Sequence, residues 1–541
     1  MKPTTIKTFL DVHTWTGLGA GLALFIAFYT GAITVFTHEL DIWDQYSVPA
    51  HSEQNYAMAE ELLQRVLSAE PASAESLRLE LSSEDHPGNI ARWYQRLEDG
   101  SYTSHEFRLT GEDTLDTAPN SSNLAGFIYV LHYTAGLPSS FGLYVLGIIC
   151  VIYGIALVSG LIVFLPNMMK DLFVVRSGHN KKRFWLDAHN VVGVMSLPWH
   201  IMFAWSSALL AIGVFLLAPF QWMVFDDDLM PIVGPELGRI STLAPSGNNA
   251  PMLSVSEIVH ITQKEVPGLE PTQLRYSHAG DANATVRVIG KTRTENLDPW
   301  ASLILKANNG DILNVSHPDN KSPGATFYDG LVALHFVSFG GYLAKWVYLL
   351  LGLAGAFLFY SGNLLWIESR RKRRKLEQLR STVFLARLNS GVCIGCMAGV
   401  SAAFLTSRGL SGFAERANMM ELSYYLVFFA SILWSFLRPV AVGTRELLLV
   451  CGMLTLAIPI FDALFLDTSA VGYAIAGHWI VLVTDIVAIL AAAAFFWIAN
   501  TVNKRAKYGD PNSVWSSSSH GARADQLQAP TSEITNTPVQ H

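Results

Sequence analysis

Four histidines of this 541-residue chain occur in two pairs that a repeated motif relates to each other. His13 and His189 both end a Leu-Asp-x-His sequence, and each has a glycine four residues later. His132 and His335 both follow a leucine and precede an aromatic residue. An internal repeat brings equivalent side chains together across a pseudo-two-fold axis. The four imidazoles are therefore candidate axial ligands for two haem irons.

The residue types favour haem over other metal centres. Two neutral imidazoles on facing helices, with no cysteine or carboxylate nearby, are too few for a structural zinc site, which takes four ligands. A porphyrin supplies four nitrogens itself, and with both axial positions filled the iron carries electrons and has no open position for oxygen. The chain has no Cys-x-x-Cys-His sequence, which excludes c-type attachment. The prediction is two haem b groups per chain.

Chain order predicts which histidines share an iron. His13 and His189 begin apolar segments on one side of the membrane, whereas His132 and His335 precede segments entered from the other side. We therefore expect one iron between His13 and His189 and the other between His132 and His335. A boundary histidine can also lie simply among lipid headgroups. The repeat makes this alternative less favoured for four histidines together, since an intramembrane histidine must be paired, buried or bound.

His200 is a further candidate. It follows His189 by eleven residues, about 16 Å along an α-helix, and the first copy of the repeat has no histidine at the equivalent position. Three roles stay open: an iron ligand opposite His132 or His335, a contact to a haem propionate, and a proton-handling group.

Membrane helices must position these residues. Half of the residues are hydrophobic and 15% are charged, and the mean hydropathy is +0.30, which indicates a polytopic α-helical membrane protein. About eight stretches approach or exceed the roughly 20 residues that span a bilayer. They are residues 15–37, 141–165, 191–217, 343–367, 384–406, 420–438, 444–466 and 472–500.

Basic residues predict the orientation. They cluster after every second apolar stretch, in residues 170–183, 370–375 and 504–505, and such loops face the cytoplasm. Both termini are then expected to be cytoplasmic, and the long inserts lie on the opposite side of the membrane. The first apolar stretch lacks a cleavage site and is expected to stay as a helix. The apolar stretches predict contact with membrane lipid. The net charge of −7 and the absence of a basic patch argue against binding to nucleic acid.

The apolar pattern divides the chain into seven parts. The expected order is a first membrane helix, a small α+β insert, the second and third helices, another α+β insert, the fourth helix with a basic loop, four additional helices and a disordered tail. In the same order they comprise residues 1–39, 40–124, 125–219, 220–326, 327–375, 376–502 and 503–541. Helix, insert and helix thus occur twice, which predicts an internal duplication over residues 10–370.

Other motifs do not indicate a second cofactor. Cys393 and Cys396 have the spacing of a redox or metal pair, but a membrane helix commonly uses cysteine as a small packing residue, and we favour packing. No glycine-rich phosphate loop follows a strand, so we expect no flavin or nicotinamide site. Electrons must then come from an external donor, either a quinol or a cytoplasmic reductase.

At these residues the sequence resembles the PepSY-associated transmembrane family, also called iron-regulated membrane proteins, which includes ferric-siderophore reductases of bacterial inner membranes. The resemblance covers about residues 5–375 and rests on the His-x-x-x-Gly openings, the Leu-His-aromatic segments, the Gly340-Gly341 pair, the stretch from Asn363 to Arg371 and the two inserts. It implies periplasmic PepSY-like inserts and haem b bound by His13, His189, His132 and His335. The four helices of 376–502 lie outside the family's four-helix core.

The resulting expectation is an oxidoreductase that reduces a ferric siderophore or another ferric chelate in the periplasm. Ferric iron is held more tightly than ferrous iron by hard oxygen donors, so one electron releases the metal. Two alternatives stay open: a non-redox protein whose inserts bind a ligand while the helices transport or signal, and a haem or iron transporter. The sequence identifies neither the chelate nor the donor.

Overall fold

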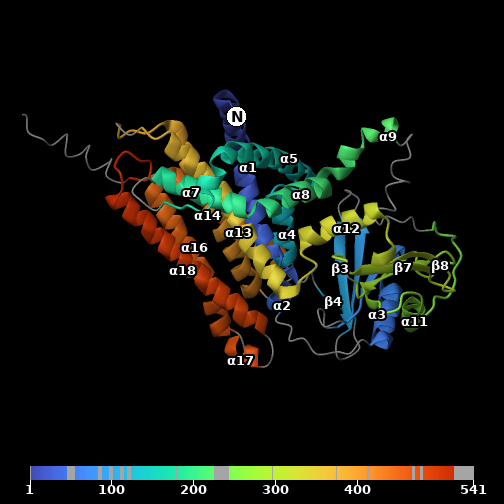
Figure 1. Cartoon of the computed structure of the whole chain (residues 1–541). Coiled ribbons are helices and arrows are strands. Elements are labelled where there is room, and N and C mark those ends of the chain that lie inside the picture. The colour runs from blue at the N-terminus through green and yellow to red at the C-terminus, as the bar shows by residue number, and fades with distance from the viewer. Residues whose placement is uncertain are drawn as a thin grey trace, which may run out of the picture.

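A computed structural model describes most of the chain. The described residues are 2–45, 55–82, 88–96, 102–109, 115–118, 124–176, 181–224, 243–294, 296–372, 375–410, 413, 415–465, 470–475 and 479–516. Two bodies are visible in Figure 1: a bundle of long helices, and beside it a β-sheet with two helices packed on it.

The helix bundle confirms the prediction of a polytopic membrane protein. Among the described residues, seven helices are long and apolar enough to cross a membrane, or eight if one bent pair counts as a span. The seven helices are α1 (Pro3–Thr34), α5 (Ser139–Phe164), α13 (Gly341–Ser369), α14 (Arg380–Gly409), α15 (Arg416–Leu437), α16 (Val440–Phe465) and α18 (Trp479–Tyr508).

The bent pair replaces the span predicted at residues 191–217. Helix α7 (Lys181–Met195) and helix α8 (Leu197–Leu217) meet at Ser196 with an angle of 69° between them. Pro198 lies in the first turn of α8, where its missing N–H costs nothing, but it cannot continue the hydrogen bonds of α7. The prediction of one uninterrupted helix here is therefore wrong.

Short helices connect the spans to the inserts. Helix α2 (Thr37–Gln45) continues from α1, α4 (Leu124–Thr134) precedes α5, and α12 (Pro323–Phe336) precedes α13. We call the end of the bundle where these three helices lie the insert side. The smaller helices α6 (Met168–Asp171), α9 (Phe220–Met223) and α17 (Ala470–Ile475) lie at other span ends.

The two inserts share one sheet. The first contributes β1 (Ser76–Glu80), β2 (Ile90–Arg96), β3 (Tyr102–Leu109) and β4 (Leu115–Ala118), and the second contributes β5 (Glu270–Ser277), β6 (Thr285–Lys291), β7 (Trp300–Lys306) and β8 (Ile312–Ser316). All neighbours are antiparallel, in the order β4-β3-β2-β1-β5-β6-β7-β8. The central β1–β5 pair joins the copies, with Arg78 opposite Arg275. The sequence predicted an α+β fold for each insert but not that the strands of both inserts join into one sheet.

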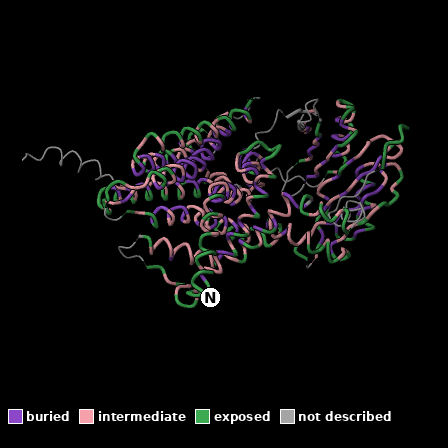
Figure 2. The backbone as a smooth tube through the Cα atoms, turned by 90° about the horizontal axis from the view of Figure 1, so that it is seen from above, coloured by how far each residue is buried: buried purple, intermediate pink, exposed green. Residues whose placement is uncertain are grey.

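One face of this sheet forms the core of the insert unit. Helices α3 (Tyr56–Ala69) and α11 (Val255–Glu265) pack on it, above alternate strand residues such as Leu79, Leu274 and Val288. Buried residues accordingly gather along the sheet and on the inner faces of the helix bundle (Figure 2). Because alternate strand residues point to opposite faces, the remaining positions lie on the other face of the sheet.

The additional helices α14, α15, α16 and α18 pack with one another, and α14 also contacts α1 and α13. The predicted disordered tail begins later than residue 503. Helix α18 continues to Tyr508, and Trp515 is buried against Leu364 and Ile367 of α13. Residues 517–541, for which we also predicted disorder, lie outside the described residues.

Candidate functional site

His13 and His189 lie side by side at the end of the bundle away from the inserts. His13 belongs to α1 and His189 to α7, and their ring centroids are 6.3 Å apart. His132 and His335 form a second pair on the insert side, from α4 and α12, with ring centroids 6.1 Å apart. The structure thus brings together the same partners that the repeat predicts.

The Nδ1 atom of each ring donates a hydrogen bond to a neighbouring helix. His13 donates to the carbonyl of Ala156 at 2.8 Å, and His132 donates to the carbonyl of Ala27 at 2.8 Å. In the second repeat the acceptors are serine hydroxyls, which donate their own protons to carbonyls of their helices. These pairs are His189 with Ser361 at 3.0 Å and His335 with Ser206 at 2.7 Å. A ring with its proton on Nδ1 presents the Nε2 lone pair, which is the arrangement of metal-bound histidines.

This geometry fits a haem with two histidine ligands. When a metal lies about 2.0 Å from one nitrogen of each of two opposed imidazoles, the two ring centroids are roughly 6 Å apart. The observed centroid distances, 6.3 Å and 6.1 Å, are close to this value. Each pair supplies two protein ligands. Among the described residues, no group of three or more His, Cys, Asp or Glu side chains could hold a metal ion. The pairs suit a cofactor that brings its other ligands, and binding itself stays a prediction.

Small residues make room for the rings. A Cβ added to Gly160 of α5 would lie 2.7 Å from Cε1 of His13, and one added to Gly31 of α1 would lie 2.6 Å from Nδ1 of His132. Both distances are shorter than carbon and nitrogen atoms tolerate. The two glycines therefore allow these helices to approach the histidine rings closely.

We expect the Gly160→Ala change to displace the ring of His13 and, if this pair holds a haem as predicted, to alter the haem spectrum. The added methyl group must push the ring away from the Ala156 carbonyl that orients it. Gly154→Ala is a matched control on the same helix, because no atom lies within 4 Å of a Cβ there. Absorption and electron paramagnetic resonance spectra of the two variants provide the measurement. Identical spectra for both would contradict this role of Gly160.

The two histidine pairs are well separated. Ala27, the acceptor for His132, lies fourteen residues after His13 on α1, roughly 21 Å along the helix axis. Aromatic rings fill the space between the pairs. Phe28 contacts Phe203 and Phe359 with centroids 5.8 Å and 5.2 Å apart, and Phe203 lies 5.9 Å from the ring of His335.

His200 belongs to this intervening cluster. Its Nδ1 forms a hydrogen bond with the hydroxyl of Tyr153, its ring lies 5.6 Å from that of Phe28, and its side chain is buried. The structure does not place it opposite His132 or His335, because those two face each other. Its buried Nε2 has no hydrogen-bond partner among the described residues. Of the three roles predicted for His200, a contact to a haem propionate and proton handling stay open.

The orienting groups Ala27, Ala156 and Ser206 were missed by sequence reasoning. A signal for Ser206 exists in the repeat, because Ser206 follows His189 by seventeen residues, as Thr30 follows His13. Ser361 belongs to the Ser-Gly pairs at 159–160 and 361–362 that recur in the two copies. The backbone acceptors leave no such signal, since every residue has a carbonyl.

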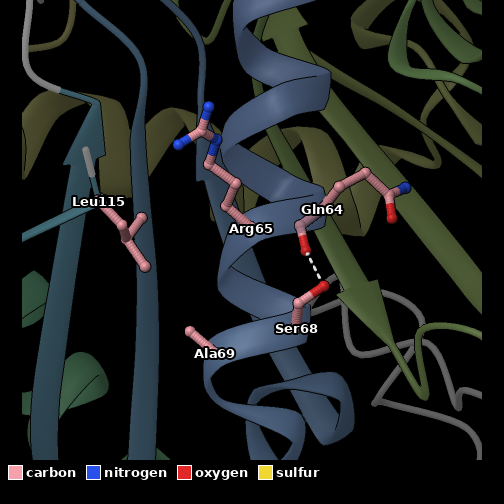
Figure 3. A pocket seen from close by; sticks show the side chains of 5 residues that line it. All are labelled: Gln64, Arg65, Ser68, Ala69 and Leu115. Atoms are coloured by element: carbon pink, nitrogen blue, oxygen red, sulfur yellow. Dashed lines mark hydrogen bonds between the residues drawn. The ribbon is translucent and has the colours of Figure 1, made fainter. Parts of the chain in front are cut away.

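Cys393 and Cys396 are buried in the apolar interface between α14 and neighbouring helices. Two surface cavities lie in the insert unit. One, of about 510 Å³, lies between α3 and β4, where Arg65 and Leu115 face the same space (Figure 3). Another, of about 950 Å³, lies where the two inserts meet and includes Glu75, His278 and Asp281 among its lining residues.

Comparison with known proteins agrees with this architecture. The model of the PepSY-associated transmembrane region matches residues 10–369. A relative from Pseudomonas aeruginosa, the uncharacterized protein PA4219, is 24% identical over 249 residues, which are 43% of this chain and 60% of that protein. This chain thus spans less than two thirds of that relative's length. Because the family match includes both histidine pairs and both inserts, the chain belongs to the family of membrane proteins with a PepSY-associated transmembrane region.

Proposed function

We propose that this chain is an inner-membrane oxidoreductase with two haem b groups that reduces ferric siderophores or other ferric chelates in the periplasm and so releases ferrous iron. One observation carries the proposal: both histidine pairs have a separation suited to a shared metal, and all four rings donate from Nδ1 to a neighbouring helix. A haem with two histidine ligands supplies reversible one-electron transfer.

The protein's own residues hold and shield these sites. His13 and His189 would hold one haem and His132 and His335 the other. The acceptors on α1, α5, α8 and α13 keep each ring in one tautomer and one orientation, which raises the basicity of the ligating nitrogen. Phe28, Phe203 and Phe359 fill the space between the pairs with packed aromatic rings.

The position of the inserts supports a direction of electron flow. His132 and His335 lie on helices that directly follow the insert unit in the chain, whereas His13 and His189 lie at the other end of α1. We infer that electrons enter from a quinol or a cytoplasmic reductase near His13 and His189. They leave toward a chelate on the insert side, which we place in the periplasm.

Reoxidation of chemically reduced protein tests the proposal. We expect ferric siderophores to reoxidise it, with ferrous iron appearing in a chelator trap. His132→Ala or His335→Ala should slow reoxidation more than His13→Ala or His189→Ala, because the first two lie nearer the inserts. A normal rate without His132, or no reaction with any ferric chelate, would contradict the proposal. Well-folded protein that never contains haem would favour ligand binding or transport instead.

A further inference from the structure

Four arginines stand side by side across the middle of the shared sheet. In the strand register Arg92 of β2 is opposite Arg78 of β1, Arg78 is opposite Arg275 of β5, and Arg275 is opposite Arg287 of β6. All four alternate with buried core residues, so they lie on the face of the sheet that α3 and α11 do not cover. We call these four residues the arginine row.

Such a row is unfavourable by itself. Like charges directly opposite each other on neighbouring strands are destabilising. Arg92 is paired with two carboxylates, Glu80 at 2.8 Å and Glu106 at 3.1 Å.

Arg78, Arg275 and Arg287 each contact a neutral side chain. Arg78 lies over the ring of Tyr94 with 5.3 Å to the centroid, Arg275 donates to the side-chain oxygen of Gln273, and Arg287 donates to the hydroxyl of Ser302. Among the described residues, Arg78 and Arg275 form no salt bridge. Burial, together with repulsion from Arg78 and Arg287, lowers the pKa of Arg275.

The arginine row faces the membrane helices. Asp41 of α2 lies close enough to interact with Arg92, and burial raises the pKa of this aspartate to about 7. Helix α2 packs against α4, the helix that carries His132. Figure 1 shows α3 and α11 on the side of the sheet away from α2. The cationic face is thus directed toward the helices of the insert-side histidine pair.

We propose that the arginine row binds an anionic ferric chelate, whose free carboxylates or catecholates give the complex a net negative charge. This inference rests on the proposed function and names its substrate class. Guanidinium groups bind carboxylates with two parallel hydrogen bonds, and four of them in line present a ladder of donors to a ligand with several acidic groups. A bound polyanion also removes the repulsion within the row.

Binding of gallium(III) citrate tests the proposal without any redox step, because gallium(III) has the charge and size of ferric iron but is not reduced. The full-length protein is studied in neutral-lipid nanodiscs by calorimetry. We expect Arg78→Gln/Arg275→Gln to weaken binding by roughly tenfold or more, since charge-assisted hydrogen bonds are lost. Arg78→Lys/Arg275→Lys should recover part of the affinity. High salt should weaken wild-type binding more than binding to the glutamine variant.

Arg65→Gln/Lys264→Gln is the matched control. It removes the same charge from α3 and α11, on the opposite face of the sheet, and Arg65 is visible in Figure 3. We expect this variant to bind like the wild type. The ligand-free Arg78→Gln/Arg275→Gln protein should unfold at no lower temperature than the wild type, because a repulsive contact is removed. Reduced thermal stability without ligand would show a structural role and overturn the proposal.

The remaining outcomes separate the two proposals. If both double variants bind gallium citrate equally, the arginine row is not the site, whereas ferric citrate reduction can continue. If binding depends on the row but ferric citrate is never reduced, the binding inference holds and the reductase proposal fails. If nanodiscs with anionic lipid abolish citrate binding and the row alone accounts for lipid binding, the ligand is a lipid headgroup and the chelate assignment is wrong.

Discussion

Purified His13→Ala protein is expected to contain one of the two haems, and His189→Ala protein the same one. Both rings belong to one pair, with centroids 6.3 Å apart, and loss of either leaves an iron with a single histidine. The double variant should lose no more than each single variant, because the two residues act on one iron and their effects are not additive. Haem extraction with acid acetone and the absorption spectrum of each variant provide the measurement.

Two other histidines provide comparisons for this experiment. His132→Ala should remove the other haem, because its ring pairs with that of His335. His200→Ala should leave the haem count unchanged, because its Nδ1 bonds to Tyr153 and the other four rings already form the two pairs. Loss of a whole haem from His200→Ala, together with normal spectra for His132→Ala, would show that the insert-side assignment is wrong.

Arg408→Met is expected to lower the free energy of unfolding by about 3–5 kcal/mol, the usual effect of breaking a buried ion pair. Arg408 of α14 lies 3.0 Å from Asp462 of α16, and the two side chains are 1% and 0% exposed. Trp43 of α2 also donates to Asp462, and the guanidinium of Arg408 lies 3.9 Å from the centroid of its ring. Removing Arg408 leaves a buried carboxylate without this partner. Equilibrium unfolding in detergent measures the change.

An exposed ion pair in the same part of the chain provides the control. Arg438→Met breaks the contact with Glu446, but these side chains are 42% and 29% exposed, so we expect a much smaller loss of stability than for Arg408→Met. Arg408→Met/Asp462→Leu should recover part of the stability, because no charged member of the ion pair is left unpaired, but Trp43 loses its acceptor. An effect of Arg408→Met as small as that of Arg438→Met would contradict the importance of this buried pair.

The buried ion pairs indicate that the four additional helices hold helix α2 in place. Asp44 of α2 is held by Arg416 of α15, and Trp43 is held by α14 and α16. Glu39, in the same short helix, forms an ion pair with Lys345 of α13. Helix α2 is therefore fixed between the family's four-helix core and the four added helices. Since α2 precedes the first insert and its Asp41 approaches the sheet, we expect a destabilised Arg408 variant to hold the inserts less firmly.

Much of the fold followed from the sequence alone. Long apolar stretches predicted the spans because a bilayer requires about 20 such residues in a helix, and the family match agrees with the resemblance inferred from the histidine motifs. The bend between α7 and α8 was missed, because Pro198 within an apolar run is compatible with either a straight or a broken helix. The sheet was also missed as one unit, since β1 and β5 are nearly two hundred residues apart and no local pattern records which strand edges meet.

The candidate site was likewise predicted only in part from the sequence. The internal repeat determined that His13 belongs with His189 and His132 with His335, because duplicated segments place equivalent residues symmetrically. Only the tertiary structure decided which groups orient the rings, where His200 lies and that Arg78 and Arg275 stand opposite each other. Residue types and spacing along the chain record local periodicity and duplication. Contacts between segments distant in sequence depend on packing and strand register, which are settled only when the whole chain folds.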